Sequence, residues 1–190
     1  MQSSRAFTLI ELLIVVAIIA ILAAIAVPNF LEAQVRAKVA RVRTEMRSLA
    51  VALEAYRTDQ PAYPPYFLSP SIRVQPTSAR LRLLTTPVAY VSSIWKDVFA
   101  LKSLDPNYDA FDYVDEESGK RFFTPPFDYQ WTYGYAWIMN SMGPDIINQF
   151  RSIGFPDMFY DPTNGTVSTG DIVRAGPRGQ YFQEYYAPIQ

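Results

Sequence analysis

Few residues in this chain are suited to acid, base or nucleophilic chemistry. Its 190 residues include no histidine and no cysteine, and the formal net charge at pH 7 is -1. The lack of histidine removes the usual general base and the usual zinc ligand, and with them every Ser-His or Cys-His pair. The balanced charge gives no sign of nucleic acid or of an acidic substrate as a partner. The groups left to consider are carboxylates.

One set of oxygen donors lies in residues 160–174, YDPTNGTVSTGDIVR. Calcium prefers six to eight oxygen ligands from carboxylates, amides, hydroxyls and carbonyls. The spacing does not match an EF-hand loop, and a turn held by Asx and Ser/Thr hydrogen bonds would use the same residue types. Both interpretations stay open for the five donors of this stretch, Asp161, Asn164, Thr166, Ser168 and Asp171.

A second acidic group is the run Asp115-Glu116-Glu117. Paired carboxylates can serve acid and base catalysis. This run stands beside Ser118, Gly119 and Lys120, however, a composition typical of a turn. We expect a solvated turn here.

The third acid, Glu11, stands near the start of a long apolar segment. Leu12 to Val27 carries no polar side chain, and a helix from Phe7 to Val27 would be roughly 31 Å long, about one hydrocarbon core. A secretory signal with its cleavage site at residues 24–26, a single-span anchor, and a helix buried among copies of itself all fit this segment. A carboxylate in a spanning helix is costly unless it lies at the interface or is paired.

The elements that must position these groups begin with a helix. Apolar residues recur from Leu31 to Tyr56 at spacings of three and four, which predicts an amphipathic helix packed on its own domain. Five basic residues lie along it, Arg36, Lys38, Arg41, Arg43 and Arg47. No aromatic residues alternate with them, so a solvated or inter-subunit face is favoured over nucleic-acid binding. Pro28 should kink or locally unwind the helix, and the prolines of residues 58–65 should end it.

The rest of the chain, residues 60–190, predicts a small domain of strands and loops. Residues 60 to about 125 are expected to be largely irregular, apart from a helical turn at 79–84 and a short element at 90–95. Tyr129, Trp131, Tyr133, Tyr135 and Trp137 alternate with smaller residues, which predicts a strand over 128–138 with its aromatic face in the core or at a subunit interface. Residues 158–160 and 171–174 are further candidate strands. The expected fold class is α+β, a long N-terminal helix packed on a small antiparallel sheet.

The segment AFTLIELLIVVAII, residues 6–19, resembles the N-terminus of type IV prepilins and of type II secretion pseudopilins. The resemblance implies a leader of residues 1–6, cleavage by a prepilin peptidase between Ala6 and Phe7, and methylation of the new Phe7 amine. It also implies that Glu11 pairs with the N-terminal amine of an adjacent subunit. The family usually has glycine before the cut, and this chain has Ala6.

That resemblance divides the chain into the leader, a membrane and assembly helix over 7–29, its amphipathic continuation over 30–59, and a globular domain. Its partners would be further copies in a filament and an inner-membrane assembly platform. The single-pass protein would sit in the inner membrane with its globular domain outside the cytoplasm, before joining a filament in the periplasm or at the cell surface. The five basic residues after the span argue for the opposite orientation, since basic residues favour the cytoplasmic side. We give the resemblance more weight.

The resemblance also bears on metal binding. Major pseudopilins of type II secretion lack a C-terminal disulfide and bind calcium in a C-terminal loop, and residues 141–145 and 170–172 resemble that region. It implies Asp145 and Asp171 as the first ligand candidates, with Asp161 and Asn164 beside them. We therefore expect a pseudopilus subunit and not an enzyme. The alternatives are a surface type IV pilin and, more remotely, a membrane-anchored binding protein.

Overall fold

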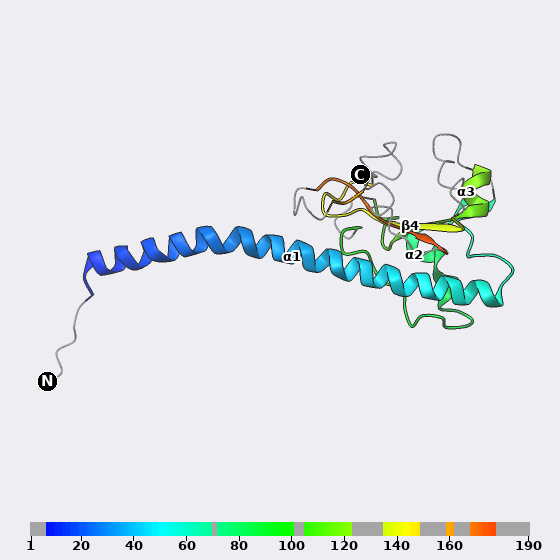
Figure 1. Cartoon of the computed structure of the whole chain (residues 1–190), viewed down its shortest axis with the longest axis horizontal. Helices are drawn as coiled ribbons and strands as arrows, with labels where there is room; N and C mark the ends of the chain where they lie inside the picture. The colour runs from blue at the N-terminus through cyan, green and yellow to red at the C-terminus, as the bar shows by residue number, and fades with distance from the viewer. Residues whose placement is uncertain are drawn as a thin grey trace, which may run out of the picture.

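The computed structural model describes residues 7–69, 72–100, 105–122, 135–148, 159–161 and 168–177. One helix, α1 (Leu9–Asp59), dominates the molecule with 51 residues. Figure 1 shows its first half extending away from everything else, while the remaining elements gather beside its second half. The expected α+β class, a long helix with small antiparallel sheets, is confirmed.

The second half of α1 packs on the domain through the predicted stripe. Val39, Val42, Met46, Leu49 and Leu53 are all buried, and Val35 and Tyr56 pack at the edges. A helix buries one face when its apolar residues recur every three or four positions, so the stripe from Val35 onward belongs to the protein's own core. Leu31, the first residue of the predicted stripe, is 52% exposed and does not join that core. The helix ends at Asp59, where the Gln60 amide donates to the Tyr56 carbonyl at 2.9 Å, as the prolines that follow predict.

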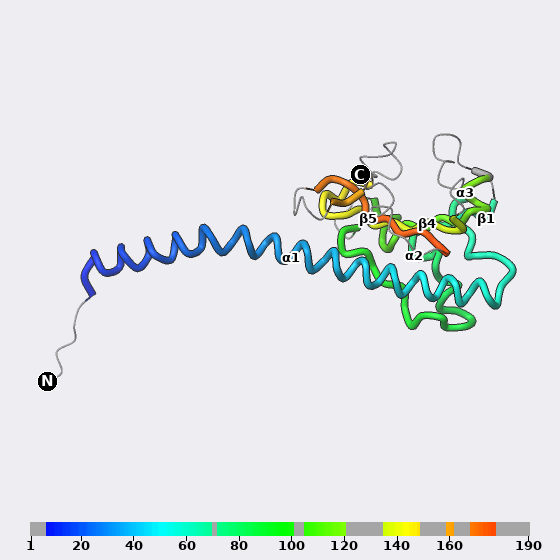
Figure 2. Tube along the Cα trace, in the orientation of Figure 1, coloured from blue at the N-terminus to red at the C-terminus, as the bar shows by residue number. Residues whose placement is uncertain are grey.

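Pro28 neither ends nor interrupts α1, which runs through it as one element. The expectation of local unwinding there was wrong. Proline removes one backbone hydrogen bond and causes a local clash, but the helix continues on both sides of it. Figure 2 shows a gentle change of direction in the blue half of α1.

The main sheet has three antiparallel strands in the order β3 (Asp112–Asp115), β4 (Trp137–Ser141) and β5 (Ile172–Gly176). Tyr113 pairs with Met139, which pairs with Arg174. A separate hairpin joins β1 (Phe67–Ser69) to β2 (Ile72–Arg73). Short helical elements fill the connections, α2 (Thr77–Arg80), η1 (Arg82–Leu84) and α3 (Glu116–Phe122).

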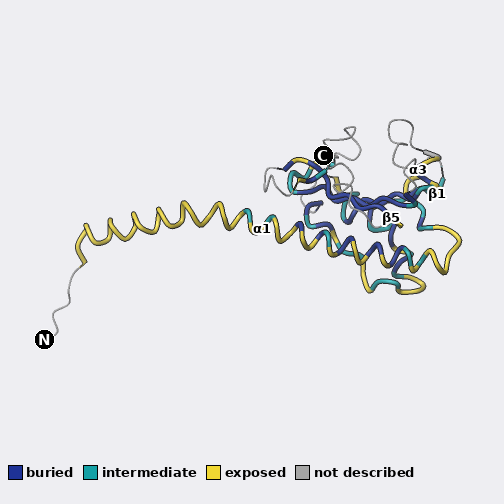
Figure 3. Tube along the Cα trace, viewed as in Figure 1, coloured by how far each residue is buried: buried dark blue, intermediate teal, exposed yellow. Residues whose placement is uncertain are grey.

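Both faces of the main sheet are buried. Tyr113, Trp137 and Met139 join the cluster formed with α1. Val114, Ile138 and Val173 belong to a second cluster that includes Tyr66 and is packed against Phe67 and Phe159. Alternate residues of a strand point to opposite faces, which is why neighbours in one strand divide between the two clusters. Figure 3 shows the resulting concentration of buried chain in the sheet, against the exposed first half of α1.

Several sequence expectations for the domain are settled by these elements. The helical turn at 79–84 is confirmed by α2 and η1, and 171–174 lies at β5. Residues 90–95 form no helix or strand. Phe159 lies in no strand and forms an isolated parallel bridge to Asp171, and residue 158 lies outside the described residues.

Two expectations were wrong in a physically informative way. The supposed acidic turn at 115–120 is instead the end of β3 and the start of α3, because Asp115 accepts from the Ser118 amide at 2.9 Å and so caps that helix. The predicted aromatic face of a strand over 128–138 is not formed by its two described residues, Tyr135 and Trp137. Tyr135 precedes β4 and lies in the second cluster, whereas Trp137 lies in the first. Residues 129–133 of that predicted strand lie outside the described residues.

Candidate functional site: the start of helix α1 and the loops beside the sheet

The start of α1 is built by a reciprocal pair of side chains, Thr8 and Glu11. The Thr8 hydroxyl accepts from the Glu11 amide at 3.2 Å. Glu11 Oε2 in turn accepts from the Thr8 amide at 2.9 Å and from the Thr8 hydroxyl at 2.8 Å. This capping box satisfies backbone donors that have no partner within the helix.

Sequence reasoning singled out Glu11 and missed Thr8. The signal was present, because Thr8-Leu9-Ile10-Glu11 before an apolar run is the S/T-x-x-E pattern of a capping box. Both described contacts of the carboxylate use Oε2. Within the described residues, Oε1 therefore remains available for a further donor. Phe7 is 73% exposed at this end, and Ala6 lies outside the described residues.

The apolar half of α1 has no partner in its own chain. Every residue from Phe7 to Leu31 is exposed, including Phe30 at 63%. In the described part of the chain, α1 is the one helix long and apolar enough to cross a membrane, and its most apolar window is wholly unburied. Apolar surface on this scale must be covered by lipid or by other protein.

The candidate metal ligands differ in their burial and in their hydrogen-bond partners. Asp145 Oδ2 accepts from the Gly170 amide at 3.3 Å, which brings the loop after β4 next to the residue preceding Asp171. Asp171 is 1% exposed and accepts from the Asn140 amide group at 3.2 Å. Asp161 is exposed at its side chain, while its backbone amide donates to Ser168 Oγ at 2.8 Å.

These contacts bring three of the candidate segments together, and Asn164 lies outside the described residues. The approach is close because both glycines adopt positive φ, +67° at Gly143 and +118° at Gly170. A Cβ on Gly143 would meet the Gly170 carbonyl oxygen at 2.3 Å. Among the described residues, no three acidic side chains lie close enough together to hold a metal ion. The contacts described between these loops are the hydrogen bonds of Gly170 to Asp145 and of Asp161 to Ser168.

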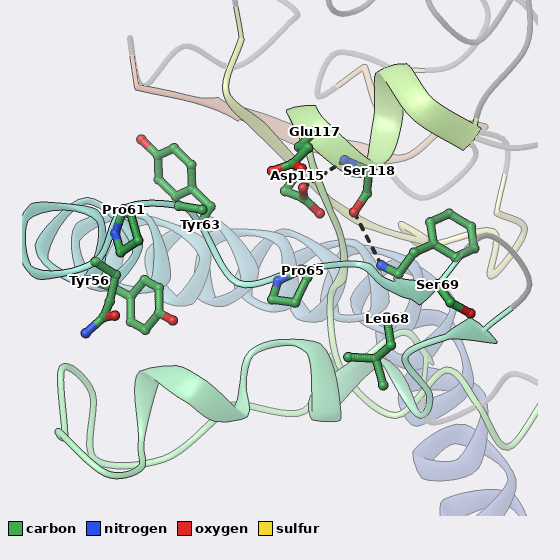
Figure 4. A pocket seen from close by; sticks show the side chains of 12 residues that line it. Tyr56, Pro61, Tyr63, Pro65, Leu68, Ser69, Asp115, Glu117 and Ser118 are labelled. Carbon is green, nitrogen blue, oxygen red and sulfur yellow. Dashed lines mark hydrogen bonds between the residues drawn. The ribbon is translucent and has the colours of Figure 1, made fainter.

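A pocket of about 290 Å³ lies at the far end of α1, shown in Figure 4. It is lined by Tyr56 and Tyr63, by Pro65 and Leu68, and by the acidic residues around the start of α3. The carboxylate of Asp115 is occupied by the fold itself, since it accepts from the amides of Tyr66 at 2.7 Å and Ser118 at 2.9 Å. An acid held by two backbone donors in this way stabilises structure.

A long helix, half of it bare and apolar and half of it packed on a small antiparallel sheet, is a pilin-like arrangement. Residues 1–27 match the prokaryotic N-terminal methylation motif. The chain is 48% identical over 60 residues to the type IV major pilin protein PilA of Myxococcus xanthus, covering 32% of this chain and 27% of that one. It is 46% identical over 63 residues to the type IV wide pilus major component PilA4 of Thermus thermophilus, 33% of this chain and 48% of that one.

The chain is also similar to a secretion protein. It is 43% identical over 63 residues to the type II secretion system core protein G of Pseudomonas aeruginosa, 33% of this chain and 44% of that one. These matches span between about a quarter and a half of the relatives' lengths. No solved structure matches the chain significantly. The resemblance to type IV pilins and type II secretion pseudopilins is thereby confirmed.

Proposed function

We propose that this chain is a structural subunit of a helical filament, and specifically of a type II secretion pseudopilus. The observation that supports this most strongly is the bare half of α1, whose apolar residues all remain exposed up to Leu31. In a bilayer this surface is covered by lipid, and in a filament it is covered by the same surface of neighbouring copies. Neighbouring copies that are displaced along an axis bring different faces of this helix into contact, and such a heterologous contact generates an open helical filament where its rotation does not close into a ring.

The start of α1 supplies the contact that we propose for assembly. A prepilin peptidase cuts between Ala6 and Phe7, and the new Phe7 amine carries a positive charge. Glu11 of a neighbouring subunit accepts this amine through the oxygen that the Thr8 contacts leave available. A paired carboxylate in an apolar setting is tolerated and fixes the register of the two helices.

The subunit that we propose first resides in the inner membrane, with its globular domain outside the cytoplasm, and an inner-membrane assembly platform transfers it to the filament. The protein named core protein G supports the secretion role, while the two pilins support the second candidate, a surface pilus subunit. Neither candidate needs catalytic residues, since the work of the chain is polymerisation.

One experiment separates the two candidates. If the chain is a pseudopilus subunit, cells that lack it should retain in the periplasm proteins that are normally exported. Their surface filaments should be intact. If the chain is a surface pilus subunit, cells that lack it should export these proteins normally and lose their surface filaments. Filaments sheared from wild-type cells should then consist mainly of this chain. If neither secretion nor surface filaments change, the filament proposal fails for both.

We further propose that the loops beside the sheet bind calcium through Asp145 and Asp171, with Asp161 and Asn164 as additional ligand candidates. The support is the approach of residues 145 and 170–171, together with the abundance of oxygen donors in this region. Binding to the folded state alone raises the melting temperature. An unchanged melting temperature of the full chain with calcium or with a chelator would remove this proposal, and Asp145→Asn should abolish any shift that is seen.

A further inference from the structure

When the apolar half of α1 spans a bilayer, the rise of the helix fixes the distance of the exposed cations that follow it from the membrane. Phe30 and Leu31, both exposed, are the last apolar residues before Glu32. At 1.5 Å per residue, the Cα atoms of Arg36, Lys38 and Arg41 lie about 8, 10 and 15 Å beyond that of Leu31. The interfacial layer of a bilayer is roughly 5–8 Å thick on each side, and helical side chains lean toward the N-terminus, here toward the membrane.

These three cations are distributed around the helix. Successive residues turn by about 100°, so Lys38 lies about 200° and Arg41 about 140° around the axis from Arg36. A protein partner that docks on one side of α1 meets one face of it. Lipid headgroups surround a single spanning helix, and only cations spread over its circumference can reach them from every side.

The cations are also accessible. All three are exposed, and Val39 is the first residue of α1 that the domain buries. Arg36 pairs with Glu32 and Arg41 pairs with Glu45, each one helical turn away. The Arg36–Glu32 pair lies at the surface and contributes little free energy, so a phosphate can replace that carboxylate. Glu45 is buried at 8% exposure and accepts from Arg41 Nε, so Arg41 keeps this pair and offers a phosphate its terminal guanidinium nitrogens. In the described part of the chain Lys38 makes no ion pair, and residues 32–41 carry three cations and one acid.

We propose that Arg36, Lys38 and Arg41 form a cationic collar that binds the phosphates of anionic phospholipids in the leaflet facing the globular domain. The guanidinium fork of arginine suits phosphate oxygens, and lysine adds a point charge. The collar sets the height of the domain above the bilayer while α1 still spans it. It also accounts for basic residues on the exported side of a span, which the usual charge bias disfavours. The inference rests on the membrane stage of the proposed function.

The test uses the full chain reconstituted in phosphatidylcholine vesicles that contain some phosphatidylglycerol. A trace of spin-labelled phosphatidylcholine or of spin-labelled phosphatidylglycerol is added, and its spectrum gives the fraction of that lipid in contact with the protein. We expect phosphatidylglycerol to be favoured, by roughly fivefold for each engaged cation. The preference should fall as salt rises from 0.01 M to 1 M, because the screening length shortens from about 30 Å to about 3 Å.

Two triple variants make the result specific. Arg36→Gln, Lys38→Gln and Arg41→Gln together should abolish the preference. Arg47→Gln, Arg57→Gln and Arg82→Gln remove three exposed cations elsewhere and should preserve it, since even Arg47 lies about 24 Å beyond Leu31 along the helix. Circular dichroism and melting of both variants show that the fold is intact.

The proposal is overturned by equal association of both lipids with the wild type, by a preference that survives in the collar variant, or by an equal loss in the control variant. A collar variant that keeps the lipid preference but no longer forms filaments assigns these cations to contacts between copies and overturns it as well. A chain that does not float with the vesicles disproves the membrane stage of the proposed function itself. The lipid measurement requires no filament, so the two failures are distinguishable.

Discussion

The indole of Trp137 donates to Glu54 Oε1 at 2.7 Å and thereby ties the central strand β4 to α1 across 83 residues of sequence. The other oxygen of the same carboxylate accepts from the Tyr63 hydroxyl at 3.0 Å. One half-buried acid near the end of α1 thus holds both the sheet and the first residues of the connection that leaves the helix. The globular domain is locked to the helix at this point.

Replacing Glu54 with alanine should cost about 1–3 kcal/mol of unfolding free energy, because the Trp137 N–H is left without its partner next to the core. The measurement is urea unfolding of the full chain in detergent, followed by tryptophan fluorescence. Glu117→Ala is the control, since Glu117 is exposed and makes no ion pair in the described part of the chain. A loss in Glu117→Ala as large as that in Glu54→Ala would contradict the role given to Glu54.

Tyr63 should make the fold sensitive to alkali. Burial, followed by its hydrogen bond to the Glu54 carboxylate and the charge of that carboxylate, raises the pKa of Tyr63 from 10.0 to about 12. The folded protein therefore retains a proton that the unfolded chain releases above pH 10. Its contribution to stability is complete below pH 10 and is lost as the pH rises to about 12.

The comparison that isolates this effect is Tyr63→Phe. Other tyrosines titrate in the same range, so urea midpoints of the wild type and the variant should be measured from pH 8 to pH 11.5 and subtracted. We expect the wild type to lose more stability than the variant over that range. Parallel curves would show that folding does not raise the pKa of the Tyr63 hydroxyl.

Gly176 should not tolerate a methyl group. It pairs with Trp137 across β4 and β5, and a Cβ at this position would lie 2.1 Å from Trp137 Cζ2. The indole cannot move away easily because its N–H is bound to Glu54. Gly176→Ala should therefore cost about 1–3 kcal/mol of stability by overpacking. Much of that cost should disappear in the background Trp137→Leu, where the smaller side chain leaves room, and full additivity of the two changes would contradict the steric explanation.

Arg80 and Asp112 form a buried ion pair in the domain, with exposures of 2% and 3%. The guanidinium also lies 4.3 Å from the ring centre of Tyr66. Arg80→Met keeps the apolar bulk but leaves Asp112 buried and without its cation, so we expect a loss of about 3–5 kcal/mol at neutral pH. The double variant Arg80→Met with Asp112→Leu should recover part of that loss in urea unfolding. If the single variant is as stable as the wild type, the pair contributes nothing.

The features that sequence reasoning found are those set by neighbouring residues. The helix follows from apolar residues three and four positions apart, and the membrane-length segment follows from its composition. Strand β3 was not found because two of its four residues are aspartates, which are uncommon in strands. Their partners lie far away in sequence. Asp112 pairs with Arg80, 32 residues away, and Asp115 accepts from the Tyr66 amide, 49 residues away. No local sequence pattern predicts contacts between residues so far apart in the chain.

The candidate functional residues differ in the same way, between those set by neighbouring residues and those set by the fold. Glu11 was recognised as an acid out of place in an apolar run. Thr8 was missed, although its three-residue spacing from Glu11 is the pattern of a capping box. The approach of residue 145 to residue 170 depends on two left-handed glycines and on the pairing of β4 with β5. That approach is a property of the fold.

Glu11 caps helix α1 in the structure and has a second role in the proposed function, and one substitution can separate the two. Its carboxylate accepts from the Thr8 amide to begin α1, and the proposed function has it accept a charged amine from a neighbour. Glu11→Gln keeps an oxygen acceptor for the Thr8 amide but carries no charge, whereas Glu11→Ala removes both. We expect both variants to be cleaved after Ala6 and both to assemble poorly, because a neutral amide cannot offset the charge of a buried amine. Quantifying filaments and the processed subunit by immunoblot checks this. Normal filaments from Glu11→Gln beside a failed Glu11→Ala would show that Glu11 acts through the helix cap, and the charge pairing between subunits would be refuted.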